Sequence, residues 1–335
     1  ICIRKHHFKF KYRQYCPIIS AMKKLLTLFL TVFFLFGTVS CAPEQNFEEG
    51  IFDPDFQKGF FVSNINGTTG NFPGMLTYNG TCFDPYWRVA QWWCKYDLAA
   101  AQESFSNGFY EYRDQEKVLS VNPDRGEIYL ELDGRAVYGE TPRREGENWP
   151  SLLLDQYFGT NLYLHQLEAL FVCIDFKIEC IEDFMNGLAQ ENLHSAQFQW
   201  ITTVQDLNPN SYGYKDYFWF GLPFFDYRYE FPRAFESQDV GKEDSTGKYS
   251  LFLAGNEFME KPVTVGNRVT VRFDILPYLK SAFEKTQQKG YMQHSTYENL
   301  ALGAFNIGWE ITGIYRAGVR IYDMSVEMHG GKNET

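Results

Sequence analysis

The body of the chain alternates hydrophobic and polar residues over many short segments. From Glu127 to Asp133, Ile128, Leu130 and Leu132 alternate with polar or charged residues. The same period of two recurs in ALFVCIDFKIE, QFQWITTVQ, DYFWFGL, YSLFLAG, NRVTVRFDI, LGAFNIGWEITG and AGVRIYDMSVEM. Such alternation is typical of half-buried strands, and turn-rich stretches such as GKEDSTGK separate them. The pattern predicts an all-β protein.

One segment has a helical period instead. Ile275, Leu279 and Phe283 recur at helical spacing, and Gly290 ends the pattern. We predict one insertion helix near 275–289, packed across a sheet edge. No linker or internal repeat follows residue 50, so 51–331 is expected to be a single domain. These elements predict a jelly-roll-type antiparallel β-sandwich.

The N-terminal segment resembles a bacterial export signal. Two lysines follow Met22, an apolar run of about 12 residues is too short to span a bilayer, and small residues precede Cys41. We predict a lipoprotein signal peptide at 22–40, acylation of Cys41 by chains such as palmitate, and a tether at 41–50. Residues 1–21 are interpreted as a mis-called upstream extension.

Charge and anchoring restrict the partners. The first 40 residues hold seven of the 31 Lys and Arg residues and none of the 42 Asp and Glu residues, so the chain from Cys41 onward carries −18. Such acidity disfavours nucleic acid as a partner. Attachment to the lipid bilayer is expected through acylated Cys41, in the cell envelope and at the outer membrane.

Four further cysteines follow Cys41. In an exported protein, proximity favours Cys82–Cys94 and Cys173–Cys180 disulfides, although the strand pattern around Cys173 equally allows a buried free thiol there. No cysteine spacing indicates a zinc site.

Two neighbouring strands carry the strongest candidate binding groups. His194 begins a strand whose polar face presents Gln197 and Gln199, and the next strand presents Tyr217 and Trp219. If the apolar rows face the core, the polar rows share an outer face, where amides could pair with sugar hydroxyls and rings could stack. The alternatives are an ordinary outer sheet face or a face covered by the helix.

Asp226 and Arg228 extend this candidate ligand-binding set as a polar rim. A calcium site is a second functional interpretation of the same loop region, but the stretch lacks a recognised calcium-loop spacing. An ion pair that braces the loop is the simpler alternative. We predict no metal and no cofactor, because the sequence has no P-loop, dinucleotide fingerprint, GxSxG or HExxH motif.

Two other features have competing interpretations. Trp87, Trp92 and Trp93 could form a sugar-stacking platform, but core packing is favoured. Glu310 could act as an acid; a glycosidase then needs a second carboxylate about 5–10 Å away, and Glu131 is the candidate. Nothing in the sequence brings these two carboxylates together, so no catalytic residue is assigned.

Several blocks between Glu147 and Gly313 resemble a family of exported bacterial proteins of Bacteroidetes and planctomycete type. They are GENWPSLLLDQYF, HSAQFQW, YFWFGLPFFDYRYEFP, DILPY and NIGWEITG, in this order, over about half the chain. The family is uncharacterised, and the resemblance implies a fold similar to carbohydrate-binding jelly rolls. The family pattern has histidine at Ser151 and glutamate at Asp155, so roles that need those side chains do not carry over.

The leading hypothesis is a non-catalytic, membrane-anchored extracytoplasmic lipoprotein that binds a glycan or polysaccharide on a sandwich face. The alternative is a polysaccharide lyase or glycoside hydrolase on the same fold, with His194, Tyr217, Gln197 and Arg228 supplying base, acid and charge neutralisation. A third hypothesis is a structural surface lipoprotein without a small ligand.

Overall fold

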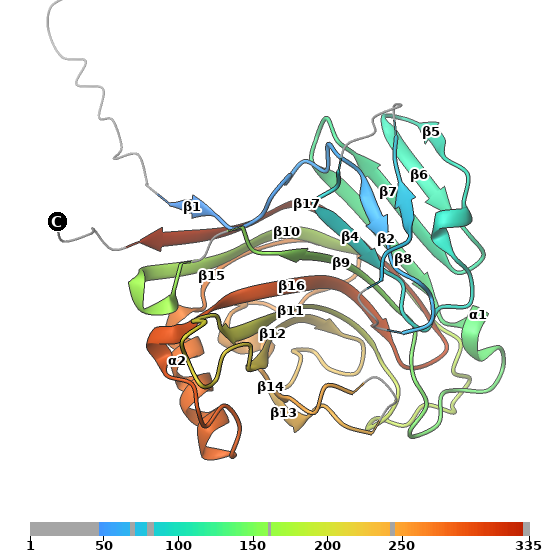
Figure 1. The fold of residues 1–335 in the computed structure, drawn as a ribbon. Helices are drawn as coiled ribbons and strands as arrows, with labels where there is room; N and C mark the ends of the chain where they lie inside the picture. The colour runs from blue at the N-terminus through green and yellow to red at the C-terminus, as the bar shows by residue number, and fades with distance from the viewer. Residues whose placement is uncertain (1–46, 68–70, 79–83, 160–161, 242–244, 331–335) are drawn as a thin grey trace, which may run out of the picture. The chain divides into compact units, whose positions relative to one another are not determined.

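The computed structural model describes residues 47–67, 71–78, 84–159, 162–241 and 245–330. The expected signal peptide, Cys41, most of the expected tether and Cys82 lie outside these ranges. The described part consists of two β-sheets packed face to face with one substantial helix (Figure 1). The predicted jelly-roll-type β-sandwich is therefore confirmed.

Within the described residues, sheet A has eight strands. In spatial order they are β15 (Arg268–Asp274), β10 (Leu167–Asp183), β17 (Tyr315–Gly330), β8 (Glu127–Asp133), β7 (Lys117–Asn122), β6 (Phe109–Arg113) and β5 (Ser104–Ser106), with β1 (Glu48–Glu49) also paired to β17. All of these pairings are antiparallel.

Sheet B has nine strands in the part of the chain that the structure describes. In spatial order they are β13 (Phe235–Gln238), β14 (Tyr249–Phe252), β12 (Tyr217–Asp226), β11 (Ala196–Asp206), β16 (Leu300–Ile311), β9 (Ser151–Tyr157), β4 (Trp87–Ala90), β2 (Phe60–Val62) and β3 (Gly74–Leu76). The β12–β14 and β2–β4 pairs are parallel, and the other pairings are antiparallel.

The core lies between the sheets and is rich in aromatic rings. Phe176 of sheet A packs against Phe198 and Phe224 of sheet B, with ring centroids 5.2 and 5.4 Å apart. Trp309 of sheet B donates its indole N–H to the Leu130 carbonyl oxygen of sheet A, at 3.2 Å. Each buried ring of this size contributes about 1.5–3 kcal/mol. The inner rows are the apolar rows that the sequence pattern indicated.

The expected helix is α2 (Leu276–Gln288), which packs against β10 and β12. The Asp274 carboxylate accepts the backbone N–H groups of Leu276 and Leu170, both at 3.0 Å, and so joins the helix start to β10. Gly290, with a φ of 91°, follows the helix end. The remaining described helices are short: α1 (Arg135–Tyr138) and 3₁₀ turns at Leu98–Ala100, Leu164–Gln166, Gly255–Glu257 and Tyr297–Asn299. Within the described ranges, no helix has the length and apolar character needed to cross a membrane.

Two expectations need correction. The expected tether ends before residue 50, because Glu48–Glu49 pair with Glu327–Met328 and the Glu49 carboxylate accepts the Val326 N–H at 2.9 Å. Cys173 and Cys180 do not form a disulfide. They are free thiols seven residues apart on β10, where an extended backbone separates them by roughly 23 Å. Cys94 is a buried free thiol.

Candidate functional site

The two predicted polar rows share the outer face of sheet B. Thr203 pairs with Trp219 and Gln205 pairs with Tyr217 across the β11–β12 ladder, while Phe218 and Phe220 point into the core. Side chains of directly opposed residues lie on the same face of a sheet. The face therefore carries amides, hydroxyls and two aromatic rings from adjacent strands. Of the two predicted amides, Gln197 is half-buried, whereas Gln199 is only 4% exposed.

Tyr217 and Trp219 form a fixed aromatic pair on this face. Their rings meet edge to face, with centroids 5.3 Å apart. The indole N–H of Trp219 donates to the Thr246 hydroxyl at 3.3 Å, and that hydroxyl donates to Asp239 at 2.7 Å. Both rings are half-buried. Burial raises the pKa of Tyr217, so its phenol is a neutral hydrogen-bonding group at neutral pH.

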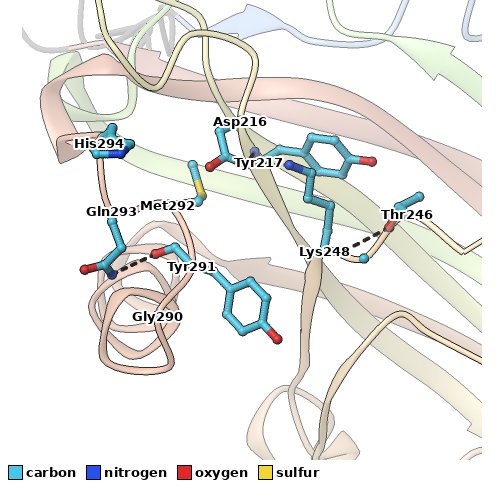
Figure 2. Close-up of a pocket in the computed structure, with 10 residues that line it drawn as sticks. Asp216, Tyr217, Thr246, Lys248, Gly290, Tyr291, Met292, Gln293 and His294 are labelled. Carbon is cyan, nitrogen blue, oxygen red and sulfur yellow. Dashed lines mark hydrogen bonds and ion pairs between the residues drawn. The ribbon is translucent and has the colours of Figure 1, made fainter.

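A cavity of about 350 Å³ adjoins Tyr217. Figure 2 shows Tyr217, Lys248 and Thr246 on one side and the segment after α2, Tyr291 to His294, on the other. Lys248 donates to the Asp216 carboxylate at 2.6 Å, and its ammonium lies 5.1 Å from the Tyr217 ring centroid. A pocket of this volume, with a ring and several polar groups, matches the usual dimensions of small-ligand sites.

His194 does not line this face as a free polar group. It is 2% exposed, Nδ1 accepts the Gln190 N–H at 3.0 Å, and Nε2 lies 2.8 Å from the Arg143 carbonyl oxygen. Both ring nitrogens therefore join two loops, and neither is available to abstract a substrate proton.

Asp226 and Arg228 form the ion pair that the simpler alternative expected. Arg228 donates to both carboxylate oxygens at 2.9 and 2.6 Å, Ser195 donates at 2.6 Å and Gln197 at 2.9 Å. Burial raises the pKa of Asp226, but the hydrogen bonds from Arg228 and Ser195 outweigh burial, and the pKa is lower than its ordinary value. Asp226 is 3% exposed and holds the turn after β12 in place.

Glu310 also lies on the outer face of sheet B, opposite Gln197 in the ladder. The Gln199 side-chain amide donates to Glu310 at 2.5 Å. Glu131, the expected second carboxylate, belongs to sheet A, where it pairs with Arg316 at 3.0 Å. The structure thus places Glu131 and Glu310 on different sheets, and they do not form a catalytic pair.

Asp155 is another carboxylate that the described residues place on this face. It pairs with Asn306, four residues from Glu310 on the neighbouring strand, which corresponds to roughly 13 Å along the strand. Glycosidases need about 5–10 Å between their carboxylates. Asp226 lies nearer in the ladder, but its oxygens are fully used by hydrogen-bond donors.

A second cluster on this face was not predicted as a site. Arg88 forms an ion pair with Asp155, and its guanidinium lies 4.0 Å from the ring centroid of Tyr157. Tyr157 is 64% exposed. Burial raises the pKa of Asp155 to about 6, against the opposing effect of Arg88. The continuous leucine run in SLLLDQY hides the alternation that would have placed Asp155 and Tyr157 on one face.

The tryptophan-rich segment does not form an exposed platform. Trp87 is fully buried, packs edge to face on Phe305 with centroids 5.8 Å apart, and donates to the Asp53 carbonyl oxygen at 2.8 Å. Trp92 and Trp93 are half-buried. For Trp87, core packing is the correct alternative.

No family model matches the chain, and no curated protein matches it significantly. The fold is similar to solved structures of family 12 glycoside hydrolases. The endoglucanase Cel12A from Rhodothermus marinus has 11% identity and a TM-score of 0.38, covering 69% of this chain and 97% of that chain. A family 12 xyloglucanase from Bacillus licheniformis has 8% identity and a TM-score of 0.41, covering 68% and 97%. The xyloglucanase domain of NopAA from Sinorhizobium fredii has 12% identity and a TM-score of 0.36, covering 68% and 96%. These scores describe a distant likeness of fold and carry no conclusion about activity.

Proposed function

We propose that this chain is a lipid-anchored extracytoplasmic protein that binds a neutral glycan, without cleaving it, on the outer face of sheet B. The observation that carries the proposal is the fixed Tyr217–Trp219 pair beside the Thr203 hydroxyl and the Gln205 amide of β11. Tryptophan and tyrosine offer large, rigid surfaces for sugar rings, and neighbouring amides can both donate to and accept from hydroxyls.

The charges on this face support a neutral ligand. Arg88, Lys248 and Arg228 each form an ion pair with a carboxylate of the same face. A negatively charged uronate would have to displace one of those carboxylates from its arginine or lysine. Breaking the existing ion pair costs Coulomb energy, and burying the uronate costs desolvation energy. The lyase alternative also loses His194 as a base, because both of its ring nitrogens are engaged.

The carboxylate arrangement supports binding over hydrolysis. Glu310 is held by Gln199, and the backbone positions of Glu310 and Asp155 are offset by roughly 13 Å along the strands, more than the about 5–10 Å that hydrolytic mechanisms use between their carboxyl groups. The proposed lipid anchor at Cys41 is supported by the signal-like sequence before that residue.

Trp219→Ala is expected to weaken glycan binding at least tenfold, equivalent to about 1.4 kcal/mol, because the central stacking surface is lost. The measurement is native affinity electrophoresis through gels containing cellulose derivatives, xyloglucan, alginate or pectin, followed by an assay for chain shortening. Phe105→Ala is the matched control, since Phe105 is a 61% exposed ring on β5 of the other sheet.

Retardation by a neutral polymer, lost in Trp219→Ala and kept in Phe105→Ala, supports the proposal. Equal retardation of both variants would exclude this face. Chain shortening would show that the protein is an enzyme, and selective retardation by alginate or pectin would contradict the neutral ligand.

A further inference from the structure

One rung of sheet B carries an aromatic ring at each end, the half-buried Trp219 and the exposed Tyr157. Trp219 of β12 pairs with Thr203 of β11. The β11–β16 register shifts between Thr202 and Val204, so Thr203 faces the two residues Gly303 and Ala304. Ala304 then pairs with Tyr157 of β9. Three strand spacings separate the backbones of Trp219 and Tyr157, which corresponds to about 14 Å.

The residues between the two rings are small. The Thr203 hydroxyl accepts the Ala304 N–H at 2.9 Å across the bulge. A Cβ atom at Gly303 would lie 2.5 Å from Gln205 Oε1 and 2.6 Å from Thr203 Oγ1, so a larger residue at 303 would displace both side chains. Small residues thus keep the floor between Trp219 and Tyr157 low.

Tyr157 is exposed but held in place. The Arg88 guanidinium lies 4.0 Å from the Tyr157 ring centroid and 5.2 Å from that of Phe72, and Asp155 fixes Arg88 by an ion pair. A ring that is 64% exposed and supported from one side resembles Trp219 in presenting a rigid surface to solvent at low entropic cost. No single sugar ring can contact both Trp219 and Tyr157 across four strands.

We propose that Tyr157 forms a second sugar-binding subsite, so that the ligand is a linear chain lying across β12, β11, β16 and β9 rather than a monosaccharide or a chain end. This inference rests on the proposed function and defines its ligand class as the interior of a neutral polysaccharide. Trp219 forms one end of the path and Tyr157 the other, with Thr203 and Ala304 as its floor.

The test is the dependence of affinity on oligosaccharide length, measured by calorimetry with the unaltered protein and its variants. The first series runs from cellobiose to cellohexaose, and a matching series is cut from any other polymer that the affinity gels identify. In the unaltered protein, affinity is expected to rise at least tenfold with length. Tyr157→Ala should abolish that rise and leave the disaccharide affinity unchanged.

Two further variants separate this effect from misfolding. Tyr157→Phe keeps the ring and should keep the length dependence. Tyr322→Ala removes a comparable arginine-contacted ring from sheet A, where Arg268 lies 3.9 Å from the ring centroid. This variant should change neither the disaccharide affinity nor the rise of affinity with oligosaccharide length. Length dependence that persists in Tyr157→Ala would overturn the second subsite while leaving the Trp219 site intact. If Trp219→Ala has no effect, or no neutral polymer binds, the proposed function itself fails and the subsite fails with it.

Discussion

Asp226→Ala is expected to destabilise the fold by about 3 kcal/mol, measured by chemical unfolding at neutral pH. The substitution removes the acceptor of four side-chain hydrogen bonds, from Arg228, Ser195 and Gln197. It leaves the Arg228 guanidinium, only 21% exposed, without its carboxylate. A loss of this size is a large fraction of the 5–15 kcal/mol by which domains are usually stable.

Asp175→Ala is the matched control. Arg268 binds Asp175 through two hydrogen bonds of 2.6 and 2.7 Å, the same bidentate geometry, but the Arg268 side chain is 54% exposed. That loss should be at most about 1 kcal/mol. Equal losses in the two variants would contradict burial as the source of the Asp226 effect.

The lowered pKa of Asp226 adds a pH signature. Its stabilisation is present above the ordinary aspartate pKa of about 4 and is lost as pH falls through the lower folded-state pKa. Asp226→Asn should therefore be less stable than the unaltered protein at pH 7, with the difference shrinking below pH 4. If the stability difference between Asp226→Asn and the unaltered protein does not change with pH, the lowered pKa of Asp226 does not contribute to stability as proposed.

The strands were predictable because burial follows a period of two. The predicted apolar rows, such as Phe198 with Trp200 and Phe218 with Phe220, are the rows that the structure buries. Strand order was not predictable, because the alternation of apolar and polar residues indicates which face a side chain occupies but not which strands pair with each other. Glu131 and Glu310 look equivalent in sequence, yet they belong to different sheets.

The outer face of sheet B was only partly predictable for the same reason. Tyr217 and Trp219 alternate with buried phenylalanines, so the sequence pattern places them on this face. His194 was predicted as a site residue from its residue type alone. Both of its ring nitrogens are hydrogen-bonded to backbone groups of Gln190 and Arg143, and no local sequence pattern reveals these contacts. The sequence pattern does not place Tyr157 on the same rung as Trp219, because that alignment arises only from pairing through β11 and β16.

Lys117→Met is expected to destabilise the fold by roughly 3–5 kcal/mol. The Lys117 ammonium is completely buried. It donates to the Tyr96 carbonyl oxygen at 2.6 Å and lies 2.9 Å from Asp114 and 3.3 Å from Glu116. Burial lowers the pKa of Lys117, but the interactions with Cys94, Glu116 and Asp114 together more than offset burial, so the pKa is raised and the side chain is charged. Methionine keeps an apolar stem of similar length and leaves the buried Glu116 carboxylate without its cation.

The double variant Lys117→Met with Glu116→Gln tests this explanation. A neutral amide oxygen at 116 can still accept the backbone N–H groups of Lys95 and Tyr96, which now bond to Glu116 at 2.7 and 3.1 Å. The second substitution should recover a substantial part of the loss. Lys285→Met is the surface control, because Lys285 is 46% exposed in its ion pair with Glu236 and should cost less than about 1 kcal/mol. If the double variant is no more stable than Lys117→Met alone, the loss comes from the packing of the lysine stem and not from an uncompensated charge.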